Sequence, residues 1–549
     1  MEYSYLNDTL VMLAATVLAV ALCLRMRMSP ILAYLGVGVV VGPFGLGLIS
    51  DIEHIRIFAE FGVVFLLFSI GLEFSIPLLM RMKAAVLGLG SAQVLLTAAL
   101  TMAVALLLGL SSESALVLGG VIAMSSTALV TKQLADQVEL HTRHGRNSLG
   151  ILLFQDLMVV PFLILVTPLT GATSHMSILT VAIALGEAAL VLLFIFAFGR
   201  WVLRPLFAMV ARFRSAELFT LTVLLIVLCS AWLTHRIGLS FALGAFLAGV
   251  MLSETEFRHQ VDAEIRPFRD LLLGLFFITI GMMLDTAMLP SVWLAALLLV
   301  MAIVLCKGMI VALFCRLGGW NNAVSMRTGL ILAHGGEFGF AILVLAMNGD
   351  ILAPNDGQVV LAAMLFTMVI APVLIRYNGR IAALLLPRSM QQSRKEISDR
   401  IMTVSHALNH HVIVCGYGRV GSHTVAFLIE NAISCMAIDL DPEQVQCGMA
   451  AKHPVSYGDA GSLSLLRACG LQRASALVLS MIDFNTAMKI IAQVRTVDKE
   501  LPIIVRTRKE MHLYQLYQAG ATEVVADTFG SDQMLTAEML RRLGVTCEA

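Results

Sequence analysis

Residues 152–161 read LLFQDLMVVP and place Gln155 and Asp156 inside an apolar run that continues to Val166. Nothing nearby in the sequence neutralises the charge of the aspartate. An aspartate at the centre of a membrane helix costs about 2.5–3.5 kcal/mol on insertion scales, unless it is paired or faces a water-filled cavity. The stretch therefore predicts a functional carboxylate, provided that the surrounding chain spans a membrane.

The composition of the chain indicates a polytopic membrane protein. Of its 549 residues, 58% are hydrophobic and only 13% are charged, whereas an ordinary soluble domain has about 25% charged residues. The apolar character fills residues 6–386, and the rest reads as soluble protein. The formal net charge is zero, so no nucleic-acid partner is expected. The nine cysteines are scattered, so neither a metal site nor a disulfide framework is expected.

The apolar region contains about thirteen runs of the length, about 20 residues, that crosses a bilayer as a helix. They lie near 6–24, 30–48, 57–75, 84–110, 114–133, 148–170, 177–203, 216–235, 239–253, 268–286, 291–315, 326–348 and 357–386. Basic residues gather in every second loop, whereas the intervening loops hold only Arg56 and Arg236. By the positive-inside rule, the N-terminus then lies outside and the C-terminal part in the cytoplasm.

Similar segments recur along this region at an offset of about 210 residues. Residues 58–72 resemble 268–282, residues 154–161 resemble 365–372, and Leu35-Gly36 matches Leu243-Gly244. The offset corresponds to seven spans, an odd number, so the two repeats would run in opposite directions across the bilayer. Inverted repeats are typical of secondary transporters, whose binding site lies near the middle of the membrane.

Two of the predicted spans are interrupted at matching positions. Residues 123–128 (AMSSTA) bring three hydroxyls into one span, and residues 334–339 (HGGEFG) bring three glycines and a charge into another. Unwound backbone is tolerated at this depth where it faces a cavity and not lipid. The matched pair therefore favours a functional role for the interruptions, although a packing contact of small residues is the alternative for the first interruption alone.

Asp156 is the candidate transport residue, because a carboxylate in a cavity can hold either a proton or a monovalent cation. Gln155 can form hydrogen bonds but cannot carry a second proton, so one titrating acid per cycle predicts electroneutral exchange. A structural aspartate bonded to a helix end is the alternative. Lys307 is expected to brace the crossing of the two interrupted helices or to pair with Asp156, and Glu337 to line the path or to cap a half-helix.

The transmembrane domain, 1–386, is followed by a polar linker, 387–410, and a soluble domain, 411–549. In the soluble domain, glycines at 416, 418 and 421 follow a predicted strand and open a helix, and Asp439 ends the next strand about 20 residues on. This is the fingerprint of a dinucleotide-binding fold. Strands alternate with helices as far as residue 527, which predicts a six-stranded, doubly wound parallel sheet.

A nucleotide site is expected where the strands of this sheet end. The candidate residues are Gly416, Gly418, Arg419, Val420, Gly421, Asp439 and Asp459. Arg419, at the start of the helix, could meet a phosphate, or it is a solvated surface arginine. No general acid, nucleophile or second substrate domain accompanies the fingerprint, so we expect a regulatory nucleotide sensor and not an enzyme.

Together these residues resemble the Kef-type potassium/proton antiporters of the monovalent cation:proton antiporter-2 family over nearly the whole chain. The most specific pieces are FQD at 154–156, the two interruptions, residues 58–73 and 266–282, and a fused TrkA-N (RCK-type) domain with GYGRVG at 416–421 and YGDA at 457–460. The resemblance implies a secondary active transporter with an antiporter-like membrane fold.

The resemblance also implies potassium efflux coupled to proton entry in a bacterial inner membrane, with K⁺ bound at Asp156 beside Gln155, Ser126 and Thr127. It implies a homodimer through the membrane and RCK domains and regulation by AMP or NAD(H). It does not decide whether an ancillary subunit is present. Glutathione control is not expected, because Gln515 and Tyr517 stand where glutathione-gated relatives present arginines, and the chain stops at Ala549. Sodium/proton exchange, a ligand-gated cation channel and a membrane-anchored oxidoreductase are the alternatives.

Overall fold

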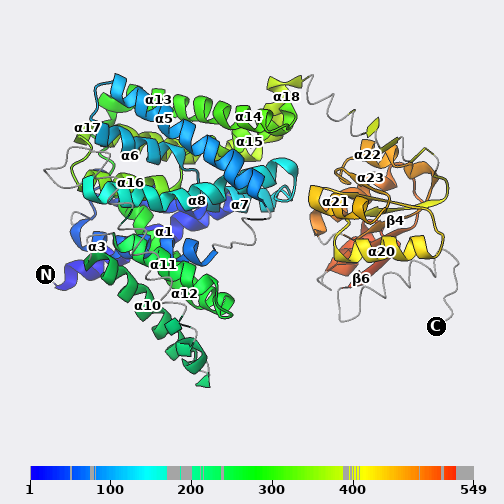
Figure 1. Ribbon diagram of the computed structural model, residues 1–549, viewed down its shortest axis with the longest axis horizontal. Helices are drawn as coiled ribbons and strands as arrows, with labels where there is room; N and C mark the ends of the chain where they lie inside the picture. The colour runs from blue at the N-terminus through cyan, green and yellow to red at the C-terminus, as the bar shows by residue number, and fades with distance from the viewer. Residues whose placement is uncertain are drawn as a thin grey trace. The chain divides into compact units, whose positions relative to one another are not determined.

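The computed structural model divides into two compact units. The first comprises Met1–Gln133, Asn147–Trp320 and Ser325–Ile381, and the second comprises Leu134–Arg146, Asn321–Val324 and Ala382–Ala549. The structure describes residues 2–526 except 27, 50–51, 74–79, 81, 170–185, 187–200, 204, 211, 214, 237–239, 388–394, 396–397, 400, 403–404, 407, 481–482 and 508–511. Helices build the first unit, and the second contains a β-sheet (Figure 1).

The helical part of the chain contains two π-helical segments, η1 and η2, which continue directly into α-helices. In chain order the elements are α1 (Glu2–Arg25), α2 (Pro30–Val41), α3 (Ile52–Glu73), η1 (Ala84–Gly90), α5 (Ser91–Leu107), α6 (Ser112–Ala123), α7 (Thr127–Asp136), α8 (Arg143–Leu169), α10 (Ala216–Arg236), α11 (Phe241–Ser253), α12 (Arg258–Met282), α13 (Leu289–Ala302), η2 (Ile303–Lys307), α14 (Gly308–Leu317), α15 (Asn322–Leu332), α16 (Glu337–Asn348), α17 (Pro354–Arg376) and α18 (Asn378–Leu385).

Among the described residues, seven helices are long and apolar enough to cross a bilayer, and the bent pair α15 and α16 makes an eighth. Shorter apolar helices, including α2 and α11, coincide with further predicted spans. The predicted span at 177–203 lies almost wholly outside the described residues. The number of about thirteen spans therefore stays a prediction.

Close contacts between glycines relate the two repeats in space. A Cβ atom placed on Gly71 of α3 would lie 3.0 Å from Cα of Gly249 in α11, and one placed on Gly281 of α12 would lie 2.9 Å from Cα of Gly38 in α2. Gly71 and Gly281 are separated by the repeat offset of about 210 residues, and so are Gly38 and Gly249. The same contact therefore occurs twice between the two repeats, with their roles exchanged, and in both places the absence of a side chain lets two helix backbones touch.

These contacts predict that valine is tolerated at one position of α2 and not at another two residues away. A Cβ atom on Gly38 would collide with the backbone of Ile278, whereas one on Gly36 would meet nothing within 4 Å. We expect Gly38→Val to destabilise the detergent-solubilised protein by about 1–3 kcal/mol relative to Gly36→Val. Thermal unfolding of the two variants measures this difference. Equal midpoints would contradict the close packing of α2 on α12.

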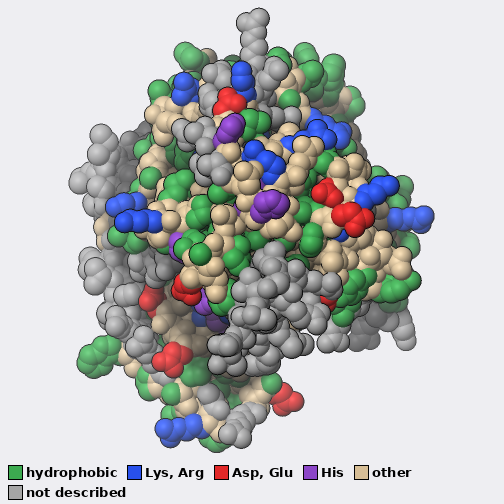
Figure 2. Space-filling model, turned by 90° about the vertical axis from the view of Figure 1, so that its right-hand side faces the viewer, with side chains coloured by type: hydrophobic (Ala, Val, Ile, Leu, Met, Phe, Trp, Pro, Cys, Tyr) green, Lys and Arg blue, Asp and Glu red, His purple; other side chains and the backbone are tan. Residues whose placement is uncertain are grey.

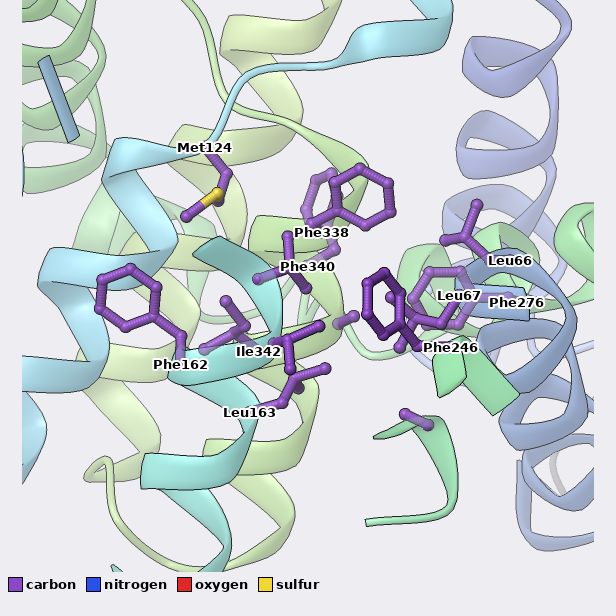
Figure 3. Close-up of a cluster of buried hydrophobic side chains, with 14 of the residues drawn as sticks. Leu66, Leu67, Met124, Phe162, Leu163, Phe246, Phe276, Phe338, Phe340 and Ile342 are labelled. Atoms are coloured by element: carbon purple, nitrogen blue, oxygen red, sulfur yellow. The ribbon is translucent and has the colours of Figure 1, made fainter. Parts of the chain in front are cut away.

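A large apolar cluster fills the first unit. Figure 3 shows side chains from several elements of this cluster facing one another, namely Leu66 and Leu67 of α3, Phe162 and Leu163 of α8, Phe246 of α11, Phe276 of α12, and Phe338, Phe340 and Ile342 of α16. Met124, which directly follows α6, belongs to the same cluster. Packing of this kind leaves little room for the helices next to an interruption to shift, because interiors are close-packed.

The outer faces of several helices carry exposed leucines, among them Leu18 of α1, Leu107 of α5 and Leu298 of α13. Large apolar side chains exposed in this number are unusual on a soluble protein. They are expected on helices that face lipid, which are apolar on the outside as well as the inside. The outer surface of the first unit thus agrees with the hydropathy of its sequence.

The second unit contains a six-stranded parallel sheet. Its strands are β1 (His411–Cys415), β2 (Cys435–Asp439), β3 (Val455–Tyr457), β4 (Ala474–Leu479), β5 (Ile503–Thr507) and β6 (Glu523–Ala526), in the order β3-β2-β1-β4-β5-β6. The predicted doubly wound sheet is confirmed. The sequence places the second and fourth strands at 434–438 and 476–480, whereas β2 starts at Cys435 and β4 already at Ala474, so these strand starts differ by one or two residues.

Helices cover both faces of this sheet (Figure 1). They are α20 (Arg419–Glu430), α21 (Pro442–Ala450), α22 (Leu463–Ala468), α23 (Phe484–Arg495) and α24 (Leu513–Gln518), with a short 3₁₀ turn, η3 (Leu471–Arg473). Alternate residues of β1 point into different cores: Val412 and Val414 pack with α20 and α21, whereas Ile413 and Cys415 pack with α22 and α23. A strand buried on both faces is typical of a parallel sheet.

Figure 2 shows one face of the protein, on which the described Lys and Arg, Asp and Glu, and His side chains are interspersed with hydrophobic ones. Positive and negative side chains are mixed on this face.

Candidate functional site

The two interrupted helices of the first unit meet at their interruptions. Residues 124–126 separate α6 from α7, and residues 333–336 separate α15 from α16, which are bent by 41° relative to each other. A Cβ atom on Gly336 would lie 2.8 Å from the backbone nitrogen of Ser126, so the two unwound segments touch there. The predicted interruptions are thus found, although the second one begins and ends earlier than expected and Phe338 is already helical.

Side chains satisfy the backbone groups that the interruptions release. Gln155 accepts a hydrogen bond from the Ser125 nitrogen at 2.8 Å. The Ser125 hydroxyl donates to the carbonyl oxygen of Leu332 at 3.0 Å, and the Gly335 nitrogen donates to the Thr367 hydroxyl at 3.1 Å. Because unpaired buried backbone groups are costly, these bonds stabilise the unwound segments.

Lys307 joins the carbonyl ends of two half-helices. Its Nζ donates to the carbonyl oxygen of Met124 at 2.6 Å and to that of His334 at 2.9 Å, and the side chain is only 1% exposed. These carbonyls follow the C-terminal ends of α6 and α15, where the helix dipoles are negative. Of the two roles that the sequence left open for Lys307, this geometry corresponds to the brace.

Glu337 lies at the opposite, positive ends of the interrupted helices. It is the first residue of α16, is buried, and accepts a hydrogen bond from the Ala128 nitrogen in the first turn of α7 at 3.4 Å. The buried Ser126 hydroxyl also caps α7, because it accepts from the Leu129 nitrogen at 3.2 Å. Glu337 thus lies at two helix N-termini as Lys307 lies at two C-termini, which favours the capping role over path lining.

Asp156 of α8 lies beside the start of α7. The Thr127 hydroxyl donates to its Oδ1 at 2.9 Å and its Oδ2 at 3.2 Å. Asp156 keeps part of its surface exposed, whereas its neighbour Gln155 is completely buried. Each carboxylate oxygen can accept more than one hydrogen bond or ion contact. The carboxylate can therefore take up a proton or a cation without giving up Thr127.

Both the oxygen and the nitrogen of the Gln155 amide form hydrogen bonds within the protein. Its oxygen accepts from the Ser125 nitrogen, and its Nε2 donates to the side-chain oxygen of Gln93 in α5 at 2.7 Å. Of the predicted ion-site residues, the structure thus brings Asp156 and Thr127 together, while Gln155 and Ser126 bond to backbone nitrogens. The sequence analysis missed Gln93, whose signal is a single amide within the apolar run at 84–110.

In the second unit, the three fingerprint glycines serve different purposes. Gly416 has a φ of +99°, which a residue with a side chain rarely adopts, and it makes the tight turn after β1. Gly418 has open space around it, and a Cβ atom on Gly421 would lie 2.8 Å from the Ser480 hydroxyl. The fingerprint requires one glycine for a tight turn, one to leave room for a ligand and one for close packing, and Gly416, Gly418 and Gly421 correspond to these in that order.

The remaining predicted nucleotide residues lie near the carboxyl ends of β1, β2 and β3. Asp439, the last residue of β2, accepts hydrogen bonds from the backbone nitrogens of Tyr417 and Asp441. Burial raises the pKa of Asp439 above its usual range, and these two hydrogen bonds offset part of the rise. Asp459 and Arg419 are exposed, whereas Val420 is buried and belongs to the core below the helix start.

Two family models match this chain. The sodium/hydrogen exchanger transmembrane model matches residues 11–377, and the TrkA-N domain model matches residues 412–527. The chain is 42% identical over 543 residues to the "Putative K(+) efflux antiporter KefB" of Alkalimonas amylolytica. The match covers 98% of this chain and 82% of that protein. It is 39% identical over 550 residues to the chloroplastic K(+) efflux antiporter 1 of Arabidopsis thaliana, with 98% of this chain and 45% of that protein covered.

A solved structure shares the fold of the membrane unit. The sodium proton antiporter MjNhaP1 of Methanocaldococcus jannaschii superposes with a TM-score of 0.52 at 17% identity and covers 69% of this chain and 98% of its own. At this identity the likeness concerns the fold alone. The exchanger model, however, matches well over half of the chain, and the KefB relative matches nearly all of it. The chain therefore belongs to the sodium/hydrogen exchanger family, as a multi-pass membrane transporter of the cation/proton antiporter type with a TrkA-N domain, and is not an enzyme.

Proposed function

We propose that the chain exchanges potassium for protons at Asp156, with potassium leaving the cytoplasm and protons entering. The observation that carries this proposal is the contrast between the two neighbours on α8: Asp156 is partly exposed with one hydroxyl partner, whereas Gln155 is buried with both amide ends bonded. The ion and direction rest on relatives named as K(+) efflux antiporters.

A single carboxylate suffices for the coupling. Bound H⁺ and bound K⁺ each neutralise Asp156, and neither leaves room for the other, so the site exchanges one for the other when it opens to alternate sides. Gln155 is neutral, and Lys307 and Glu337 are bonded to the ends of the interrupted helices. With one titrating group per cycle, exchange carries no net charge.

Proton flux in proteoliposomes against K⁺, Na⁺ and Rb⁺ tests this function. We expect K⁺ and Rb⁺ to drive proton movement without a net current. Exchange with Na⁺ alone would replace potassium by sodium as the substrate. A current that reverses with voltage and exceeds carrier rates would instead indicate a channel and contradict antiport.

The topology follows from the charge bias of the loops, since basic residues are enriched in the loops that remain in the cytoplasm. We place the protein in the bacterial inner membrane with its N-terminus outside and its TrkA-N domain in the cytoplasm. A homodimer through both parts is the assembly that the resemblance to Kef-type antiporters suggests. Reaction of single introduced cysteines with a membrane-impermeant reagent tests the orientation, and chemical cross-linking tests the dimer.

The second unit is proposed to bind AMP or NAD(H) as a regulatory ligand. Its strand order reverses between β1 and β4, and such switch points are where open α/β sheets bind ligands. Gly416 turns the chain there, Gly418 leaves space, and Asp439 ends the neighbouring strand, where a ribose hydroxyl would be bound.

Asp439→Ala should weaken binding of AMP or NADH to the full-length protein at least about tenfold, because a charge-assisted hydrogen bond to the ribose is lost. Isothermal titration of the detergent-solubilised protein measures it. Asp498→Ala is the matched control, because Asp498 also accepts from two backbone nitrogens, those of Glu500 and Leu501, but in a turn before β5. Equal losses in the two variants would contradict a ribose contact.

The raised pKa of Asp439 predicts a pH dependence of binding. A carboxylate accepts a ribose hydrogen bond most strongly when ionised, so affinity should fall as the pH is lowered through this pKa. The fall should begin at a higher pH than for an ordinary aspartate. Asp439→Asn cannot ionise and should bind weakly with a flat profile in the same titrations. A wild-type affinity independent of pH would contradict the assignment.

A further inference from the structure

Gln93 of α5 links the ion-site helix α8 to the interrupted helix α6–α7. Its Nε2 donates to the carbonyl oxygen of Ala123, the last residue of α6, at 3.2 Å and to the Thr97 hydroxyl at 3.2 Å. Its side-chain oxygen accepts from Gln155 Nε2 at 2.7 Å. Gln93, Ala123 and Gln155 have no exposed surface. The residue is therefore bonded to both elements that carry the site and to nothing in solvent.

The orientation of the side-chain amides of Gln93 and Gln155 follows from their backbone partners, which can only donate or only accept. A carbonyl oxygen can only accept, so the group of Gln93 that faces Ala123 must be the NH₂. A backbone nitrogen can only donate, so the group of Gln155 that faces Ser125 must be the oxygen. The bond between the two amides, from Gln155 Nε2 to Gln93 Oε1, then has only one possible direction. Neither residue can be replaced by a carboxylate without the loss of a donor.

This series of hydrogen bonds continues into the second repeat. The Ser125 hydroxyl donates to the carbonyl oxygen of Leu332 at the end of α15. In that repeat, the position equivalent to Thr97 is Lys307, which lies 210 residues later and bonds Met124 and His334. Each repeat has a π-helical segment close to the polar side chain that bonds an interruption, since η1 ends three residues before Gln93 and η2 ends at Lys307. Such π-helical turns are frequent at functional sites.

We propose that Gln93 is a positioning residue for cation binding at Asp156. It holds α8, through Gln155, at a fixed separation from the interruption, through Ala123. Thr127, the direct partner of Asp156, lies four residues after Ala123 in the sequence. Loss of the Gln93 bonds lets this separation vary and weakens the binding of K⁺ relative to that of H⁺. The proposal rests on the function proposed above.

Gln93→Glu gives this role a pH-dependent readout. A protonated glutamic acid can still accept from Gln155 with one oxygen and donate to Ala123 with its hydroxyl. An ionised one cannot donate, and it faces the carbonyl oxygen with a negative charge. We expect the KM for K⁺ of Gln93→Glu, divided by that of the wild-type protein, to be near one at acid pH and to rise about tenfold as the glutamate ionises.

Three further variants complete the experiment, which measures K⁺-driven proton movement by the full chain in proteoliposomes. Gln93→Leu cannot form the bonds at any pH, so its KM ratio should be raised throughout, with a smaller change in the maximal rate. Thr97→Val removes only one acceptor and should have a smaller effect. Ser91→Ala is the matched control at the start of α5, because the half-buried Ser91 hydroxyl donates to the carbonyl oxygens of Leu87 and Gly88 in the adjoining η1, and it should match the wild-type protein.

The outcomes separate this inference from the proposed function. If the wild-type protein exchanges no cation for protons, the proposed function fails. If it does, and the KM ratio of Gln93→Glu is flat across pH, Gln93 has no positioning role and the inference is overturned. A ratio that rises with pH supports it even if Gln93→Leu does not fold, because the negative charge of an ionised glutamate would by itself strengthen cation binding and lower the ratio.

Discussion

Replacing Asp156 by asparagine should abolish cation-dependent proton movement in proteoliposomes. Asparagine has the size of aspartate, and its amide oxygen can still accept from the Thr127 hydroxyl, so the fold is preserved. It cannot exchange a proton or neutralise a cation, so the proposed cycle loses its titrating group. Proton flux with K⁺, Na⁺ or Rb⁺ should fall to the level of protein-free vesicles.

Asp136→Asn provides the control for this experiment. Asp136 ends α7 and is exposed, so its replacement makes the same chemical change away from the interruptions and should leave exchange unchanged. Thermal unfolding of both variants in detergent shows whether they are folded. Full cation-dependent proton movement by folded Asp156→Asn would overturn the site assignment, and with it the proposed coupling.

The second large effect is expected at Lys307. Methionine has a similar length but no donors, so Lys307→Met leaves the carbonyl oxygens of Met124 and His334 buried without their partner. Part of that loss is offset because a buried charge is removed as well. We expect the free energy of unfolding to fall by about 2–4 kcal/mol, which reflects two unsatisfied carbonyl groups at the ends of two helices.

Thermal unfolding of the detergent-solubilised protein measures this loss. Lys83→Met is the matched control, because Lys83 lies just before η1 and is exposed, so its midpoint should stay close to that of the wild-type protein. If Lys307→Met unfolded at the wild-type temperature and had lost exchange, Lys307 would act in transport and not as a brace.

Much of the architecture could be predicted because it follows from local properties of the chain. Apolar runs of membrane length favour helical spans, and the small polar residues at 124–128 and the glycines at 335–339 lower the local helix preference, so spans and interruptions follow from short windows of sequence. The glycine fingerprint and the alternation of strands with helices likewise identify the parallel sheet. Strand ends at Cys435 and Ala474 were less well predicted, since pairing with a neighbouring strand decides them.

The candidate site itself was only partly predictable. The apolar run around them was enough to predict that Asp156 and Gln155 lie together within a membrane helix. The packing of the helices was needed to see that Asp156 is partly exposed and Gln155 is buried, that Gln93 bonds Gln155, and that Lys307 bonds two half-helices. These contacts could not be predicted because the hydrogen-bond partners of a buried polar group come from helices distant in the chain, and packing of the apolar faces determines which of these helices meet.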